Sequence, residues 1–310
     1  MRRIAAVDMG TNSFHLLIVE VNEDGSFVVL DKQREVIRLG SHKGEDLSII
    51  SDGETEKAID LLYGFKSLAN YYGAELIAAA TSAVREAQNK NEFIERVFDK
   101  TGIEVNIVDG RKEAELIYLG IRKALPVNDK KVLCIDIGGG STELLLADKG
   151  NVIFTESIKI GAVRLSKMFF PDYKLKSRAV KDCKYFIKNA LLENKNLDYS
   201  QTFDIAVGTS GTINAAASLV HSALSGKKIK SSNGLSFTYS QFRSVLSDVL
   251  AAKTPADRIA IQGMEVKRAD IIPAGLLILR RIMKNFNINE ITISEFALRE
   301  GIILNLIQNK

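Results

Sequence analysis

Two segments of the chain share one pattern of apolar strands and glycine-containing turns. Residues 3–25 read as a buried strand, a glycine turn, a second strand and a polar turn, and residues 131–150 repeat this order. When Asp8 is placed on Asp136, the two segments align without a gap through the first turn. The distance between the copies is far longer than the period of a solenoid repeat. The pattern therefore predicts two related domains, each opening with a β-meander.

Alternating helical and strand-like patterns follow each predicted meander. Ser51 and Glu54 have the spacing of a capping box, and Gly73 suits the position after a helix. In the first half, the patterns predict a helix at 51–73, a strand at 75–80, a helix at 91–102, a strand at 103–108 and a helix at 111–124. In the second half, they predict a strand, a glycine loop and a helix over 204–220, a helix at 268–283, a strand at 290–294 and a closing helix at 297–308. This order of elements is typical of the α/β class.

Pro126 and the polar run after it interrupt the patterns between the two halves. At 310 residues the chain is long enough for two domains, each with its own hydrophobic core. We therefore predict domains at 1–125 and 126–310. The closing helix 297–308 either stays in the second domain or packs back on the first.

The composition narrows the class of protein. With 46% hydrophobic and 26% charged residues, the chain has the balance of a soluble globular protein. A net charge of +4 does not favour wholesale nucleic-acid binding. Cys134 and Cys183 form no CxxC or Cys/His cluster, and no apolar run is long enough to span a membrane. We expect a cytoplasmic protein with neither nucleic-acid nor membrane partners.

The turn after Asp136 has the chemistry of a phosphate-binding loop. Gly138, Gly139 and Gly140 lack a Cβ, so the backbone can approach a ligand and offer successive N–H groups to an anion. Ser141 and Thr142 add hydroxyl donors. A hairpin turn that merely needs glycine is the alternative. Neither a dinucleotide fingerprint nor a Walker A loop fits, since the first needs a helix directly after the glycines and the second a Gly-Lys-Ser/Thr sequence.

Two further segments carry comparable donors. One is the matching turn of the first repeat, and the other is the glycine loop at 208–212, whose amides are expected at a helix N-terminus. Arg85 follows a predicted buried strand and could grip phosphate bidentately, although a salt bridge to a neighbouring Glu is equally compatible with its position. The additional candidate phosphate-binding residues are Thr11, Asn12, Ser13, Arg85, Gly208, Ser210, Gly211 and Thr212.

At this point the sequence resembles a known family. The motifs are AVDMGTNSFHLL, ATSAVREAQN, CIDIGGGSTEL, VGTSGTI, RADIIPAG and LREGI. In this order they are similar to those of the exopolyphosphatase / guanosine pentaphosphate phosphohydrolase (Ppx/GppA) family, in its short two-domain form. The resemblance implies duplicated ribonuclease H-like domains around a central cleft, as in the actin-like ATPase and sugar-kinase superfamily. It also implies a magnesium-dependent hydrolase acting on inorganic polyphosphate or guanosine pentaphosphate (pppGpp), and a homodimer.

Carboxylates at the turns are the candidate metal ligands. Asp8 and Asp136 each end a predicted strand at a glycine turn, where a hard oxygen ligand could hold a phosphate-bound Mg²⁺. A carboxylate that only caps its own turn is the alternative. The resemblance adds Glu143, which would orient the water or help to bind the metal.

A hydrolase also needs a carboxylate to activate water. Glu113 and Glu115 both lie near the start of a predicted helix, and residues two apart point to different sides, so helix geometry does not choose between them. The resemblance favours Glu113 as the base. Lys112 and Glu115 stand where the family usually has Glu and Arg.

Other functions remain open from the sequence. A superfamily kinase and a non-catalytic nucleotide-binding protein share the glycine turns, although no acceptor-site motif for a kinase is recognisable. Two basic clusters, at 173–184 and 225–232, could guide a polyanion or simply form solvated faces.

Overall fold

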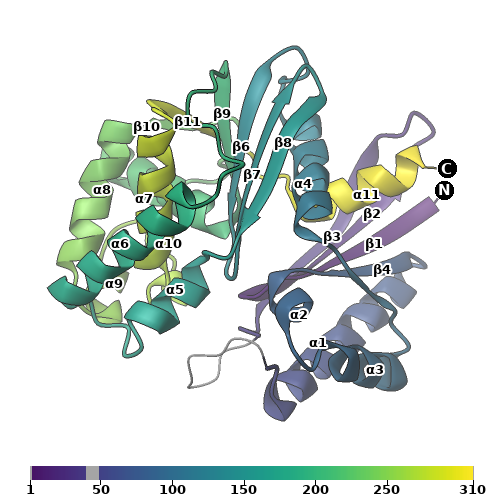
Figure 1. Cartoon of the computed structure of the whole chain (residues 1–310). Helices are drawn as coiled ribbons and strands as arrows, with labels where there is room; N and C mark the ends of the chain where they lie inside the picture. Colours follow the sequence, from purple (N-terminus) through teal and green to yellow (C-terminus); the bar gives the residue numbers. More distant parts are fainter. Residues whose placement is uncertain (1, 40–48, 310) are drawn as a thin grey trace. The chain divides into compact units, whose positions relative to one another are not determined.

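The protein is described by a computed structural model that covers residues 2–39 and 49–309 (Figure 1). The chain forms two compact units: Met1–Gly120 with Leu298–Lys310, and Ile121–Ala297. The boundary between the two units falls after Gly120, whereas the sequence predicted it after residue 125. The closing helix belongs to the first unit. Each unit contains one mixed sheet covered by helices, so the α/β prediction is confirmed.

The sheet of unit 1 follows the predicted meander. Its order is β3-β2-β1-β4-β5, and its strands are β1 (Arg2–Met9), β2 (Ser13–Val21), β3 (Phe27–Val36), β4 (Glu75–Ala80) and β5 (Val105–Ile107). The first three strands pair antiparallel, whereas β1, β4 and β5 run parallel. The carboxyl ends of β1, β4 and β5 therefore share one edge of the sheet.

The helices of unit 1 begin where local chemistry starts them. They are α1 (Asp52–Tyr71), α2 (Ser82–Glu86), α3 (Lys90–Thr101), α4 (Gly110–Ala124) and α11 (Leu298–Gln308). Ser51 and Glu54 form the predicted capping box of α1, and Gly73 follows the helix with φ of +61°. α1 packs beside α3, and α11 lies against β1 and β2.

Unit 2 repeats the sheet topology with one extra strand. Its order is β10-β11-β9-β6-β7-β8, from β6 (Lys131–Ile137), β7 (Thr142–Asp148), β8 (Asn151–Ile158), β9 (Ile205–Thr209), β10 (Ser236–Thr238) and β11 (Glu290–Ile293). β6, β7 and β8 form the second meander, and β9 pairs parallel with β6 as β4 does with β1. The repeated topology confirms the expected duplication of a ribonuclease H-like sheet.

The helices of unit 2 are α5 (Ala162–Phe169), α6 (Ser177–Leu192), α7 (Ser210–Ser225), α8 (Tyr239–Ala251), α9 (Pro255–Ile259) and α10 (Ile272–Asn285). The prediction of one helix over 268–283 was wrong at its start. Val266–Arg268 forms a 3₁₀ turn, and α10 starts later with Pro273 in its first turn, where a missing N–H costs no hydrogen bond.

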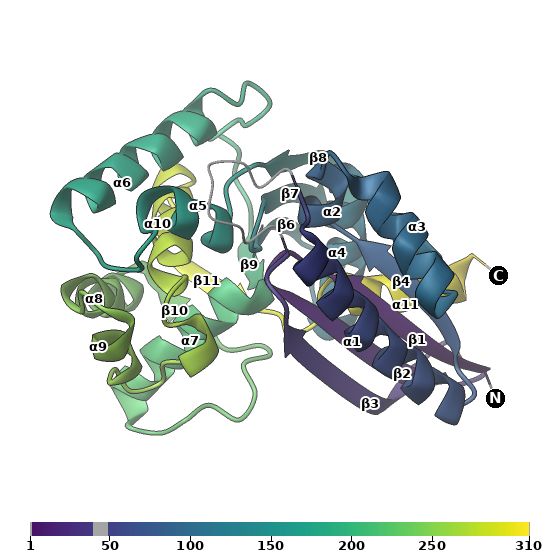
Figure 2. The ribbon, with the colours of Figure 1, turned by 90° about the horizontal axis from the view of Figure 1, so that it is seen from below.

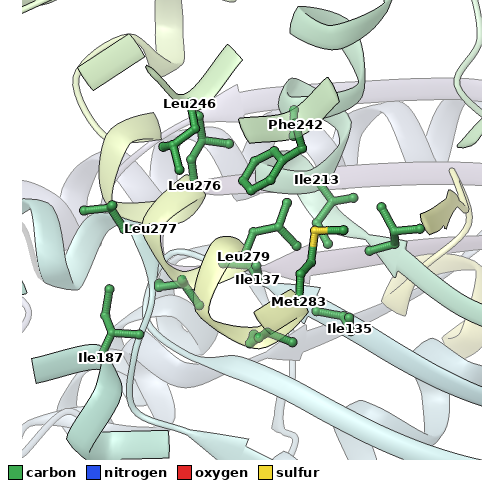
Figure 3. Packing of buried hydrophobic residues seen from close by; sticks show 14 of the residues in the cluster. Ile135, Ile137, Ile187, Ile213, Phe242, Leu246, Leu276, Leu277, Leu279 and Met283 are labelled. Atoms are coloured by element: carbon green, nitrogen blue, oxygen red, sulfur yellow. The ribbon is translucent and has the colours of Figure 1, made fainter. Parts of the chain in front are cut away.

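α10 is the central element of the core of unit 2. Leu276, Leu279 and Met283 are buried in one cluster with Ile135 and Ile137 of β6 (Figure 3). The helix is apolar on nearly all sides because α5, α6, α7 and α8 also pack around it. This packing fixes the strand ends that carry the site residues of unit 2.

Candidate phosphate and metal site

Three candidate residues of unit 1 lie at the carboxyl ends of neighbouring parallel strands. Asp8 stands near the end of β1, Arg85 lies on α2 after β4, and Glu113 lies on α4 after β5. The strand ends are tied together, since the N–H of Val108 donates to the carbonyl of Ala80 at 2.9 Å. Ligands of open α/β sheets bind at this edge.

Arg85 pairs with the candidate base. Its Nη1 donates to Oε2 of Glu113 and to the carbonyl oxygen of Val108, both at 2.7 Å. The N–H of Glu113 bonds to the carbonyl of Asp109 at 2.8 Å in the first turn of α4. The salt bridge considered for Arg85 is thus present, and its partner is a buried carboxylate.

Glu115 faces a different environment. It forms an i,i+4 ion pair with the exposed Arg111 at 3.2 Å, whereas Glu113 is only 7% exposed. The two carboxylates point to different sides of α4, as their spacing predicted. Only Glu113 is held beside Arg85 at the strand-end edge.

The first glycine turn buries a polar side chain whose amide is unsatisfied. Thr11, Asn12 and Ser13 are all buried. Neither Oδ1 nor Nδ2 of Asn12 has a hydrogen-bond partner within the described chain, while its backbone carbonyl accepts the N–H groups of Ile37 and Arg38 at 3.1 Å. A buried amide without partners is costly, so this side chain is suited to a ligand that both donates and accepts, or to a metal-bound phosphate with its water.

Two charged residues of α11, Arg299 and Glu300, adjoin Asp8 and were not predicted from the sequence. Arg299 Nη1 lies 3.3 Å from Nδ1 of His15, the β2 residue that pairs with Asp8, and its Nη2 lies 3.4 Å from Oε1 of Glu300. Burial raises the pKa of Asp8 to about 7; the guanidinium of Arg299 opposes this shift, and the carboxylate of Glu300 adds to it. The signal in the sequence was a charged pair at the start of an otherwise apolar helix.

In unit 2, Asp136 and Glu143 are direct cross-strand partners. They face each other in the register of β6 and β7, so their side chains share one face of the sheet, and both are buried. Glu143 Oε1 also accepts a hydrogen bond from Ser157 Oγ at 2.7 Å. Like charges directly opposite each other in a sheet repel, and a bound cation or proton relieves that repulsion.

This carboxylate pair fits a phosphate-bound Mg²⁺. Magnesium usually takes one or two protein carboxylates and completes its shell with water and phosphate oxygens. Within residues 2–39 and 49–309, no group of three or more His, Cys, Asp and Glu side chains could hold a metal ion. As a cross-strand pair, Asp136 and Glu143 would supply the protein ligands in unit 2, and Asp8 is the corresponding carboxylate in unit 1.

The turn at 138–140 is held in place by hydrogen bonds that its carbonyl groups accept. The carbonyl of Gly139 accepts the N–H groups of Val163 and Arg164 at 2.9 and 3.0 Å, and the carbonyl of Gly140 accepts Nε of Arg164 at 2.7 Å. Among the described backbone hydrogen bonds, none uses the N–H groups of Gly139 and Gly140. A Cβ at Gly161 would lie 2.3 Å from the oxygen of Gly139, so α5 approaches the turn this closely only with glycine there. The arrangement leaves amide donors for an anion.

The hydroxyl groups of two further candidates already have protein partners. Thr142 Oγ1 donates to the carbonyl of Ile160 at 2.6 Å, and Ser210 Oγ donates to the carbonyl of Ile137 at 2.8 Å. Ser141 is buried beside Thr142 in the turn. Thr142 and Ser210 thus connect the phosphate-loop candidates to the ends of β8 and β6.

The predicted glycine loop at 208–212 is absent from the structure. β9 ends at Thr209 and α7 begins at Ser210, which has φ of +76°. Gly208 belongs to the strand because it pairs with Ile135 of β6 and Ile293 of β11. The residue must be glycine because a Cβ there would lie 2.7 Å from the side chains of Ile213 and Ile291. The amides of Gly211 and Thr212 thus lie in the first turn of a long helix, as the anion-site prediction requires.

A buried guanidinium covers this helix start. Arg268, 7% exposed, pairs with Glu265 through Nε at 2.8 Å. A Cβ at Gly211 would lie 1.7 Å from Nη2 of Arg268, so the two are in direct contact. Arg268 belongs to the RADIIPAG motif, but the sequence alone did not predict it as a site residue. Its position adds a cation to the amides of Gly211 and Thr212.

Comparison with known proteins places the chain in a family. Residues 17–310 match the model of the Ppx/GppA phosphatase family. Exopolyphosphatase 1 of Mycobacterium tuberculosis is 30% identical over 99% of this chain and 89% of that protein. The guanosine-5'-triphosphate,3'-diphosphate pyrophosphatase of Vibrio parahaemolyticus is 29% identical over 98% of this chain and 59% of its own length. The crystal structure of an exopolyphosphatase from Cytophaga hutchinsonii superimposes with a TM-score of 0.90 at 28% identity, covering 99% of this chain and 98% of that one.

The chain therefore belongs to the Ppx/GppA phosphatase family, which confirms the resemblance seen in the motifs. Within the described residues, no helix has the length and apolar character needed to span a membrane.

Proposed function

We propose that this protein is an exopolyphosphatase that hydrolyses the terminal phosphoanhydride bond of inorganic polyphosphate and releases orthophosphate. The observation that carries the proposal is the buried Glu113 held by Arg85 at the strand-end edge of unit 1. A carboxylate fixed in this way is suited to take a proton from water. Family membership and the relatives named exopolyphosphatase support the same reaction.

In the proposed reaction, Glu113 of unit 1 is the residue that activates the water. Glu113 accepts a proton from the attacking water while the oxygen of that water bonds to the terminal phosphorus. The bond between this phosphorus and the bridging oxygen then breaks. The shortened chain leaves with the bridging oxygen as a new terminal phosphate oxygen. Arg85 keeps Glu113 in position and can present its remaining N–H groups to the phosphoryl oxygens.

The turns hold the negative charge of the substrate. The amides of Gly139 and Gly140, the amides at the start of α7 and the guanidinium of Arg268 would bind phosphate oxygens. In unit 1, Thr11, Asn12 and Ser13 would do the same, and the unsatisfied amide of Asn12 is the strongest support. Mg²⁺ bound by Asp136 and Glu143 of unit 2 would neutralise charge on the leaving phosphate oxygens.

Hydrolysis of pppGpp is the second candidate function, supported by the relative from Vibrio parahaemolyticus named for that activity. The candidate functions are distinguished by measuring orthophosphate release by the purified protein. The substrates are polyphosphate, pppGpp and ATP, each with Mg²⁺ and with chelator. Release from polyphosphate above the other two supports the first proposal, and release from pppGpp alone supports the second. Phosphoryl transfer to an added acceptor without hydrolysis would indicate a kinase, and tight ATP binding without turnover would indicate a nucleotide-binding protein.

The homodimer is a prediction of the family resemblance, and the cytoplasmic location is a prediction of the composition. Sedimentation of the purified chain and fractionation of the cells that make it would test them. A monomer at all concentrations would contradict the first.

A further inference from the structure

A short basic segment follows α7 in unit 2. Residues 226–233, which we term the lysine loop, join α7 to β10 and carry Lys227, Lys228 and Lys230, all exposed. α7 and β10 lie beside each other in the unit (Figure 2). In the described part of the chain, none of the three ammonium groups forms an ion pair with a carboxylate. By contrast, Arg178 of the other basic cluster pairs with Asp182 at 3.1 Å.

The lysine loop is fastened along α7 rather than extending freely. At its start, Ser222 Oγ donates to the carbonyl of Lys227 at 3.2 Å. At its end, Ser232 Oγ donates to Oδ1 of Asn214 at 2.7 Å, and Nδ2 of Asn214 donates to the carbonyl of Ser210 at 2.8 Å. The stretch of α7 between Asn214 and Ser222 is about 12 Å long at the rise of an α-helix. The loop therefore runs back along α7 toward its first turn.

A second set of bonds fixes the end of the loop at the edge of the sheet. The N–H of Ser232 donates to Oε1 of Glu295 at 2.6 Å, and the Oγ of Ser232 lies 3.0 Å from the same oxygen. The N–H of Glu295 donates to Oδ1 of Asn233 at 3.1 Å, and Gly234 N–H donates to the carbonyl of Ile293 at 2.9 Å. Glu295 follows β11 at its carboxyl end, beside the end of β9 that leads into α7. The three lysines are thus spaced along a path that begins at the start of α7.

We propose that the lysine loop binds phosphates of a polyphosphate chain that lie beyond the terminal, reacting phosphate. This inference rests on the proposed exopolyphosphatase function. A chain whose end lies at the first turn of α7 and whose remainder follows the helix meets Lys230 first, then Lys228 and Lys227. Ammonium groups are compact point charges that attract a polyanion without reading a particular shape. The loop has no aromatic side chain on which a guanine base could stack, so a longer inorganic chain fits it better than pppGpp.

The test is equilibrium binding to the full chain in metal-free buffer, with long-chain polyphosphate and tripolyphosphate as probes. The loop variant carries Lys227→Gln, Lys228→Gln and Lys230→Gln. The control carries Lys181→Gln, Lys184→Gln and Lys188→Gln, which remove the same charge from the exposed face of α6. We expect the loop variant to bind long-chain polyphosphate about fivefold more weakly, as three exposed charges would predict. Its affinity for tripolyphosphate, and both affinities of the control, should stay within about twofold.

An unchanged affinity of the loop variant for the long chain would overturn the inference, as would an equal loss in the control or an equal loss for tripolyphosphate. Since binding is measured without turnover, the outcome is separate from the hydrolysis proposal. A parent protein that binds polyphosphate through the loop but releases no orthophosphate would refute the proposed reaction and leave the loop assignment intact.

Discussion

Nη1 of Arg85 lies 2.7 Å from Oε2 of Glu113 and donates to the carbonyl of Val108 at the same distance. One guanidinium thus joins α2, the end of β5 and the first turn of α4. Both members of the pair are largely buried, so removing the cation leaves a carboxylate that water solvates poorly.

We expect Arg85→Gln to lower the free energy of unfolding by about 2 kcal/mol, because Glu113 then loses its charged partner. Turnover should fall as well, since Glu113 is no longer held in position. Arg96→Gln is the matched control: Arg96 bridges Asp52 and Glu56 on the surface, where ion pairs contribute little. Urea unfolding and orthophosphate release measure both effects. Equal stability losses in the two variants would show that the buried Arg85–Glu113 pair contributes no more to stability than a surface ion pair.

Gly161 should tolerate no side chain. An added Cβ would lie 2.3 Å from the oxygen of Gly139, so Gly161→Ala must push α5 away from the turn at 138–140. We expect a stability loss of about 1–3 kcal/mol and a rise in KM for polyphosphate. Gly64→Ala is the control, because nothing lies within 4 Å of a Cβ there and the position is inside α1. That change should stabilise the protein by about 0.5–1 kcal/mol in thermal unfolding. A neutral Gly161→Ala would contradict the close packing.

Asp8 makes stability depend on pH in a defined direction. Its pKa is about 7 in the folded protein against an ordinary 3.8, so the folded state binds the proton more tightly. Stability therefore decreases as pH rises from about 4 to about 7. Asp8→Asn removes this dependence, and in metal-free buffer it should gain about 1–3 kcal/mol on the parent between pH 4 and pH 8.

Asp198→Asn provides a control of opposite sign. Hydrogen bonds from Ser200 and Gln201 hold the pKa of Asp198 below its ordinary value, so this variant should lose stability relative to the parent as pH rises. Urea unfolding of the parent and both variants at the two ends of the pH range measures how each stability difference changes with pH. An Asp8→Asn curve parallel to that of the parent would rule out the raised pKa.

Binding of Mg²⁺ should depend on the cross-strand carboxylates of unit 2. We expect Mg²⁺ with phosphate to stabilise the parent by about 1 kcal/mol or more in thermal unfolding, since the ion binds only the folded pair. Asp136→Asn and Glu143→Gln should abolish this gain, whereas Asp148→Asn at the far end of β7 should retain it. Full stabilisation in both of the first two variants would show that the metal binds elsewhere.

Features set by local chemistry were predictable from the sequence. The capping box fixed the start of α1, and the duplicated Asp-Gly turns revealed both meanders. The helical spacing of Glu113 and Glu115 correctly placed them on different sides of α4. α6 was not predicted, although its apolar positions Val180, Cys183 and Ile187 have helical spacing, because basic residues surround them.

Features that depend on long-range packing were not predictable. Arg268 meets Gly211 only because the segment before α10 folds over the start of α7. Arg299 reaches the strand pair of Asp8 because α11 returns to unit 1. Gly208 resembled a loop residue, yet it lies in a strand, where two isoleucines leave no room for a Cβ.

The choice of Glu113 as the base is the central claim, and paired carboxamide variants test it most directly. Glu113→Gln keeps the size of the side chain but removes the proton acceptor, so orthophosphate release from polyphosphate should fall by about 10²-fold or more with the circular dichroism spectrum unchanged. Glu115→Gln, which loses only its pair with the exposed Arg111, should retain nearly the full rate. A Glu113→Gln variant as fast as the parent, beside an inactive Glu115→Gln, would contradict the account.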